Sequence, residues 1–381
     1  MLDTTFQIIP IVQTLQAFQK RMFPRLGSQA RISQPRKPLE PGLKAARSPQ
    51  SSLPQCRHFG TLERSPILRM LTTTLTLLTT TTISIAAISS WSPALAVDPF
   101  RDRNPRDLDE NTVEAFEAIF KTANYPVAKA ALSEALSAAP EEPLVYALLA
   151  AIDYLEAGGN ALPESFRTYA ARTRDTGAAL VTTQADPLRG NLYVAVGYFL
   201  EAADVFLAEG PLRGMPTALA NLQKTFDHLD LASIEDASDP ELNAIKGYID
   251  LMLAVALPFA NVTPALTQLE QYGGPTYLSL RGVAVGYRDL ERPEEAMQVI
   301  DRAIAAAEDN PELEYLKAQI FVEQRDYATS LQWFDQALEE HDQLLAPIVT
   351  QICRERRKAA ERAVRDGAGV EITTPEACST N

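Results

Sequence analysis

The chain has 381 residues, of which 46% are hydrophobic and 22% charged, and its formal net charge is −14. This length fits two or three ordinary domains or one long repeat array. The charged fraction excludes a polytopic membrane protein. With three cysteines and three histidines, the chain has neither the framework of a disulfide-built miniprotein nor a Cys₂His₂ or Cys₄ zinc motif, so no metal and no other cofactor is expected.

The net charge is divided unevenly along the chain. Residues 1–97 carry eleven Lys or Arg and three acidic residues, which gives about +8, whereas residues 98–381 carry 24 basic and 46 acidic residues, which gives −22. Two segments of opposite charge seldom form one folded unit. A body of charge −22 repels phosphate backbones, so we do not expect nucleic acid as a partner.

The first 97 residues indicate targeting rather than a fold. Residues 1–69 are rich in Ser, Pro, Gln and Arg, and we predict a disordered leader there, either a transit segment or a gene-model extension upstream of a true start at Met70. The uncharged span 70–96 follows Arg69 and ends with Ala94 and Ala96 on either side of one leucine. A basic flank, an apolar run and a small-x-small end are the parts of a secretory signal peptide.

Two alternatives for the span 70–96 stay open. It is long enough to cross a bilayer as an uncleaved N-terminal anchor, although its threonines make membrane insertion less favourable. Alternatively, it forms a buried core helix. An Arg- and Ser-rich presequence before an Ala-x-Ala signal is typical of import into the thylakoid lumen, and a signal peptide alone directs export to the periplasm. Export places the acidic body across a membrane, and a retained anchor tethers it there.

Beyond Pro105, apolar residues recur with the 3.6-residue spacing of amphipathic helices. Prolines and glycines divide this pattern into segments of ordinary helix length, and no alternating β-branched run of strand length occurs. We therefore predict an all-α body over 110–366, preceded by a linker over 97–109 and followed by a disordered tail over 367–381.

Residues 277–310 and 311–344 match at an offset of 34. The matched pairs follow the order small, aromatic, small, large apolar, small: Ala284 with Ala318, Tyr287 with Phe321, Ala296 with Ser330, Ile300 with Phe334, and Ala303 with Ala337. Another copy lies near the start of the body, at Ala128, Leu132, Ala135 and Pro140. Ala128 and Ala296 are 168 residues apart, close to five times 34, so diverged repeats are expected between them.

This pattern resembles the tetratricopeptide repeat (TPR) family, in an exported form of cyanobacterial or plastid type. In that family small residues lie where the two helices of a repeat cross, and large apolar residues fill the gap to the next repeat. The resemblance implies a TPR-like α-solenoid of about six helix pairs, with the segment Leu344–Arg365 as a C-terminal capping helix. Glu314 and Lys317 depart from the family pattern, and a non-repeating helical bundle is the alternative.

The sequence contains no GxSxG, HExxH, P-loop or GxGxxG motif, so we expect no enzymatic activity. The resemblance implies instead that a protein or peptide binds in a concave groove lined by the first helix of each repeat. The predicted groove residues are Arg281, Val285, Arg288, Tyr315, Gln319 and Glu323. Arg281 and Arg288 would hold a carboxylate or an acidic peptide, or alternatively form salt bridges with neighbouring acidic residues.

The expected role is a non-catalytic interaction scaffold, by analogy an assembly or maintenance factor for a membrane complex. A membrane-anchored helical adaptor and a helical enzyme without a recognisable motif are the alternatives, and the oligomeric state is left open. Cys353 lies on the last predicted helix and Cys378 in the tail. After export they would either pair, as an incidental link from tail to helix, or stay free.

The processing hypothesis predicts the mass of the mature protein. Because signal peptidase requires small side chains at both ends of Ala94-Leu95-Ala96, cleavage after Ala96 leaves an N-terminus at Val97. Intact-mass measurement of the protein from its native cells should give the mass of residues 97–381. A mass that includes residues 70–96 would instead show a retained anchor.

Overall fold

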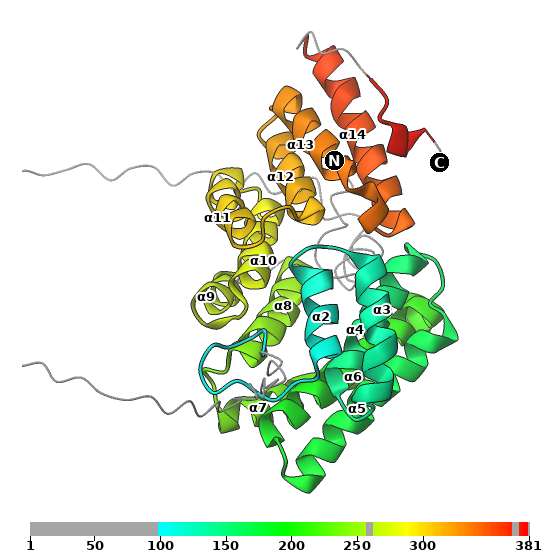
Figure 1. Cartoon of the computed structure of the whole chain (residues 1–381), viewed down its shortest axis with the longest axis vertical. Helices are drawn as coiled ribbons and strands as arrows, with labels where there is room; N and C mark the ends of the chain where they lie inside the picture. The colour runs from blue at the N-terminus through cyan, green and yellow to red at the C-terminus, as the bar shows by residue number, and fades with distance from the viewer. Residues whose placement is uncertain (1–97, 257–261, 368–372, 380–381) are drawn as a thin grey trace, which may run out of the picture. The chain divides into compact units, whose positions relative to one another are not determined.

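The computed structural model describes residues 98–256, 262–367 and 373–379 (Figure 1). Within these residues the fold is all-α, with thirteen α-helices, two 3-10 helices and no strand, in agreement with the predicted fold class. The predicted leader (1–69), the span 70–96 and its cleavage residues Ala94 and Ala96 lie outside the described residues.

Prolines and glycines mark many of the helix boundaries, as the sequence predicts. The helices are α2 (Glu110–Phe120), α3 (Tyr125–Ala138), α4 (Pro143–Ala157), α5 (Glu164–Thr183), α6 (Pro187–Arg213), α7 (Met215–Glu235), α8 (Pro240–Ala256), α9 (Thr263–Tyr272), α10 (Thr276–Asp289), α11 (Pro293–Ala306), α12 (Pro311–Glu323), α13 (Tyr327–Glu339) and α14 (Ala346–Arg365), with the 3-10 helices η1 (His341–Gln343) and η2 (Glu376–Cys378).

Side chains that precede these helices cap the free backbone N–H groups of the first turn. Asp109, Asn124, Asp186, Asn310 and Asp326 each accept a hydrogen bond from a backbone N–H of the helix that follows. Such N-caps stabilise a helix by about 1 kcal/mol each. The sequence therefore fixes where many helices begin.

Each even-numbered helix from α2 to α12 packs against the helix that follows it, and α14 packs against α13 (Figure 1). Helices α11 and α13 begin 34 residues apart, at Pro293 and Tyr327, in agreement with the matched offset. The expectation of five 34-residue steps between Ala128 and Ala296 is wrong. The second helices of the pairs between α3 and α11 are α5, α7 and α9, so only four steps separate the two positions. The middle helices are longer: α5, α6 and α7 have 20, 27 and 21 residues.

The long helices α5 and α6 cross closely because glycines face each other at the crossing. A Cβ on Gly177 or on Gly190 would collide with the backbone of the other helix. Within the described residues, the stretch Pro187–Gly210 of α6 is long and apolar enough to cross a membrane, but most of it is buried among neighbouring helices. It therefore has the burial of a core helix.

One hydrophobic core extends from Phe100 to Ala377. Most of the predicted repeat positions are fully buried in it: Ala128, Leu132, Ala135, Ala284, Ala296, Ile300, Ala303, Ala318, Ser330, Phe334 and Ala337. Tyr287 and Phe321 are half-buried, and Pro140 is exposed just beyond the end of α3. Most of these positions are therefore core residues of the fold.

Helices that are distant in sequence also meet. The side chain of Asn310 donates to the carbonyl oxygens of Phe120 and Lys121, 3.3 and 3.0 Å away. The Tyr125 hydroxyl donates to Glu312 at 2.5 Å, and α14 packs against α4. The first two helix pairs are therefore packed against α12 and α14, a contact that the repeat pattern does not predict.

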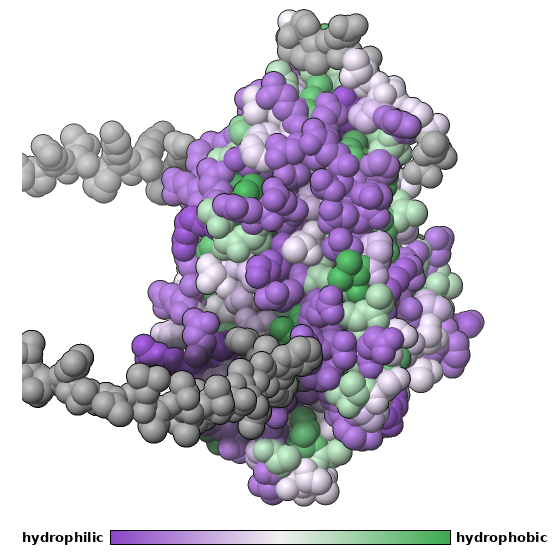
Figure 2. Space-filling view, in the orientation of Figure 1, coloured by the Kyte–Doolittle hydropathy of each residue, from purple (hydrophilic) through white to green (hydrophobic). Residues whose placement is uncertain are grey.

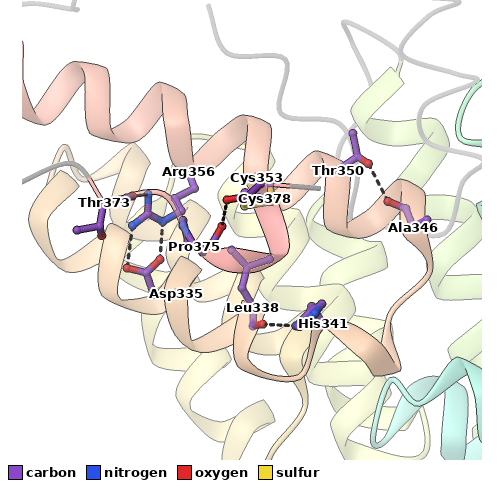
Figure 3. Close-up of a disulfide and its surroundings, with 11 residues drawn as sticks. Asp335, Leu338, His341, Ala346, Thr350, Cys353, Arg356, Thr373, Pro375 and Cys378 are labelled. Carbon is purple, nitrogen blue, oxygen red and sulfur yellow. Dashed lines mark hydrogen bonds and ion pairs between the residues drawn. A yellow bond between two sulfur atoms is a disulfide. The ribbon is translucent and has the colours of Figure 1, made fainter. Parts of the chain in front are cut away.

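The prediction of a disordered tail over 367–381 is wrong for residues 373–379, which lie against α14 (Figure 3). Cys378 forms a disulfide with Cys353, with Cα atoms 5.5 Å apart. Arg356 donates to the carbonyl oxygen of Thr373 at 2.7 Å, and Ala377 is buried. A covalent link and an apolar contact hold this segment against α14. A short polar segment without them would not stay folded there.

The disulfide should stabilise the C-terminal end of the fold. Its cysteines are 25 residues apart, and loop-closure entropy for that separation corresponds to about 3 kcal/mol. We expect the free energy of unfolding of the Cys353→Ser/Cys378→Ser variant to be lower by up to this amount. The variant should therefore unfold at a lower urea concentration. The wild-type chain under reducing conditions should match the variant, and an unchanged urea midpoint would contradict the expectation.

Candidate functional site

The predicted groove residues lie on α10 and α12, where most of them are buried. Val285, Arg288, Tyr315 and Gln319 are each no more than 3% exposed. The burial has a physical cause, since the start of α3 contacts α12 through Tyr125, and α14 contacts α12 through Glu355, which accepts from Gln319 at 2.7 Å. In the described chain these residues therefore do not line an open groove, and their contact with a partner stays a prediction.

The two arginines form ion pairs within the chain, which is the alternative that the sequence left open. Arg281 pairs with Glu312, and Arg288 pairs with Asp289 at 2.7 Å and donates to Gln319. Glu323 is half-buried, and burial raises its pKa. Replacing either arginine would therefore remove a charged partner from a buried carboxylate, and the loss of stability would obscure any effect on binding.

A cavity of about 130 Å³ lies elsewhere, among α2, α4, α6, α8 and α10. Its lining side chains are all aliphatic or aromatic, and they come from the even-numbered helices and from the segment before α2: Phe100, Phe116, Phe120, Leu144, Ala147, Leu148, Ala151, Tyr193, Val196, Phe199, Leu200, Ala244, Ile245, Tyr248, Ile249, Met252 and Leu278. Apart from Phe100, the cavity is thus lined by the first helices of five successive helix pairs.

The polar atoms nearest the cavity are engaged with the protein. The Tyr193 hydroxyl donates to Glu241 at 2.7 Å, and the Tyr248 hydroxyl donates to the carbonyl oxygen of Leu278 at 2.6 Å. What the cavity offers a ligand is therefore apolar contact.

A buried charge network lies beside this cavity, at the N-terminal ends of α4, α6 and α8. Its acidic members precede or begin these helices or lie at the start of the described chain: Asp98, Glu142, Asp186, Asp239 and Glu241. Its basic members are Arg101, Arg106 and Arg189. We call these eight residues the charge network.

Arg189 and Arg106 connect the helices within the charge network. Arg189 donates to both carboxylate oxygens of Glu142, at 2.8 and 2.9 Å, and its Nε lies 3.0 Å from Glu241. Arg106 donates to Asp186, Glu241 and Asp239, at 2.6, 2.9 and 3.2 Å. Two guanidinium groups therefore hold the starts of three helices and the segment before α2 together.

The Glu241 carboxylate of the charge network stays ionised in spite of its burial. Burial alone raises the pKa of Glu241, but Arg189, Arg106 and the Tyr193 hydroxyl outweigh it and hold this pKa below its ordinary value. Five carboxylates face three guanidinium groups, and the positive ends of the helix dipoles offset part of the excess negative charge. Burial raises the pKa values of Asp239 and Asp98, because the backbone N–H groups and Arg106 near them offset the effect of burial only in part.

The charge network fixes a segment that the sequence predicts as a linker. Asp98 accepts hydrogen bonds from the backbone N–H groups of Phe100 and Arg106, at 2.9 and 3.1 Å, and both Phe100 and Leu108 are buried. The Phe100 ring lies 4.7 Å from the Phe116 ring, measured between centroids. Residues 98–109 are therefore part of the folded body, because ion pairs and an aromatic contact attach them.

Sequence reasoning missed the charge network, although a signal for it exists. An acidic residue precedes a proline at the start of α4, α6 and α8 and at the start of the described chain: Glu142-Pro143, Asp186-Pro187, Asp239-Pro240 and Asp98-Pro99. Acid followed by proline is typical of a helix N-terminus. The dipeptides thus mark helix starts, but they do not show that the starts converge.

No protein-family model, no curated protein and no solved structure matches this chain. Within the described residues no group of His, Cys, Asp or Glu side chains is arranged to hold a metal ion. The apolar cavity and the face that surrounds it are therefore the candidate functional site, and the charge network positions one of its walls.

Removing one guanidinium group tests the charge network. Arg189→Met leaves Glu241 and Glu142 with too few partners, so the free energy of unfolding at pH 7 should fall by about 3–5 kcal/mol. Without Arg189 the pKa of Glu241 rises above its unfolded-state value, and the deficit should therefore shrink between pH 7 and pH 5 as Glu241 takes up a proton.

Urea denaturation at both pH values measures this effect. Arg167→Met is the matched control, because Arg167 forms exposed pairs with Glu164 and Asp204, and its loss should be below about 1 kcal/mol. Equal losses for the two variants, or a deficit at Arg189 that does not change with pH, would contradict the account.

Proposed function

We propose that this chain is an exported, non-catalytic scaffold of TPR-like architecture, a solenoid of six helix pairs capped by α14, and that it binds a protein or peptide. The observation that carries the proposal is the equivalence of α10–α11 and α12–α13. At the 34-residue offset, Ala284 and Ala318 are both fully buried, and so are Ala303 and Ala337. Matched burial of small residues is what a close crossing within each helix pair requires.

The even-numbered helices provide the proposed binding face. In a stacked array of helix pairs the first helix of each pair lines the concave side. Five even-numbered helices contribute apolar side chains to one cavity on this face, and Phe120, Val196 and Ile245 on its wall are half-buried. Half-buried apolar side chains of this kind serve as anchors in protein interfaces.

The charge of the body suits a partner that is not acidic. Residues 98–381 carry a net charge of −22, so long-range attraction favours a basic protein surface. On the face drawn in Figure 2, hydrophobic residues form separate patches among hydrophilic ones. The proposed partner thus presents apolar anchors with basic groups around them. It differs from the acidic peptide that the groove prediction with Arg281 and Arg288 implied.

The disulfide supports the proposed localisation. Disulfides persist in oxidising compartments outside the cytosol, and Cys353 and Cys378 are bonded. This agrees with the predicted signal peptide and with a body in the periplasm or the thylakoid lumen. There the scaffold would act as an assembly or maintenance factor for a membrane complex.

Site-specific photo-crosslinking in the cells that produce the protein tests the binding face. A photoreactive phenylalanine analogue replaces Phe120 or Ile245 on the even-numbered helices, and in the control it replaces Leu219 or Leu231 on α7, which are 55% and 46% exposed. We expect one discrete crosslinked partner from positions 120 and 245 and none from 219 and 231, because only the first two lie on the proposed binding face.

Mass spectrometry of the crosslinked product identifies the partner. A product that forms only from the α7 positions would place the interface on the wrong face. No product from any of the four positions, in a chain that is exported and folded, would contradict the scaffold role.

A further inference from the structure

We propose that the cavity among α2, α4, α6, α8 and α10 binds a compact apolar group of about the size of a benzene ring, either a free aromatic molecule or the end of a hydrocarbon chain. This goes beyond the proposed function, because the ligand is a small molecule and its site lies beneath the face that a protein partner would contact. Three features of the cavity carry the inference.

The first feature is the size of the cavity and how it arises. Its volume of about 130 Å³ is close to that of an engineered apolar cavity of about 150 Å³ that binds benzene and xenon. Ala147 and Ala151, one turn apart on α4, and Ala244 on α8 contribute small side chains to the wall. Larger residues at these positions would close the space, so the sequence itself creates the cavity.

The second feature is the chemistry of the wall. Every lining side chain is aliphatic or aromatic, and the hydroxyl groups of Tyr193 and Tyr248 donate to Glu241 and to the Leu278 carbonyl oxygen. A polar ligand would lose its hydrogen bonds to water without replacement, so the wall selects against it. An apolar ligand regains dispersion contacts with atoms that otherwise face a void.

The third feature is a wall that is not part of a helix. Of the lining residues in the described part of the chain, Phe100 alone lies outside the helices, in the segment that the charge network attaches. The carbonyl group of Phe100 approaches Gly274 so closely that a Cβ at that position would collide with it. The wall that Phe100 forms is therefore held by contacts outside the helices that make the rest of the cavity.

Methionine methyl NMR on the full chain tests the site directly. Met252 lines the cavity, whereas Met215 and Met297 are not among its lining residues. With ¹³C-methyl-labelled methionine, titration with benzene should shift the Met252 signal in a saturable manner and leave Met215 and Met297 in place. The Met252→Leu variant assigns the signal. Titration with 1-hexanol, whose alkyl end fits the same space, tests the hydrocarbon-chain source.

Variants that fill the cavity provide the second measurement. Ala147→Leu and Ala244→Leu add volume to the cavity from α4 and from α8 and should abolish the benzene-induced rise in melting temperature that wild type shows. Ala178→Leu on the exposed side of α5 is the matched control and should retain the rise. Far-UV circular dichroism confirms that each variant is folded.

The outcomes separate the ligand sources and decide the proposal. A Met252 shift with benzene alone assigns a ring-bearing ligand, and a shift with 1-hexanol as well admits a hydrocarbon chain. A Met252 signal that moves with neither probe, or equal rises in wild type and the filled variants, would overturn the proposal. The titration uses the purified chain without a partner, so it succeeds or fails independently of photo-crosslinking.

Discussion

The fold depends on keeping the carboxylate of Glu241 ionised inside the protein. Arg189 and Arg106 both contact it, and the Tyr193 hydroxyl donates to it. An ionised group without such partners would cost several kcal/mol in a buried position. Because Arg189 also binds Glu142 and Arg106 also binds Asp186, satisfying one carboxylate brings the starts of α4, α6 and α8 to one place. There the positive ends of the helix dipoles add further compensation for the excess of acidic groups.

The same interaction shapes the candidate site. Arg106 belongs to the segment before α2, so the ion pairs that satisfy Glu241 also hold Phe100 against Phe116. Phe100 forms one wall of the cavity, and Tyr193, which donates to Glu241, forms another. Polar groups therefore lie behind an apolar wall, and the hydroxyl groups of Tyr193 and Tyr248 are paired within the protein. This arrangement makes apolar contact the main interaction that the cavity wall offers.

Sequence alone predicted what depends on local signals. The 3.6-residue spacing and the Pro and Gly breakers gave the all-α fold, and the 34-residue offset identified buried positions such as Ala284 and Ala318. It did not predict contacts between distant segments, since a periodic pattern carries no signal for Asn310 reaching Phe120, or for Arg106 reaching Glu241 across 135 residues. The contacts of Tyr125 and Glu355 with α12 bury most of the predicted groove residues, and the contacts of Arg106 convert the predicted linker into a wall of the site. The tail was missed for a similar reason, because the spacing of two cysteines does not show whether they meet.

Hydrogen exchange of the full chain measured by mass spectrometry tests the dependence on Glu241 most directly. The substitution Glu241→Gln keeps the size of the side chain and removes its charge, which leaves Arg189 and Arg106 without their shared partner. Exchange should then increase together in residues 99–108 and in the first turns of α4, α6 and α8, while α11 to α13 stay protected. An increase confined to the first turn of α8 would contradict the account, because the helix starts would then be held independently of one another.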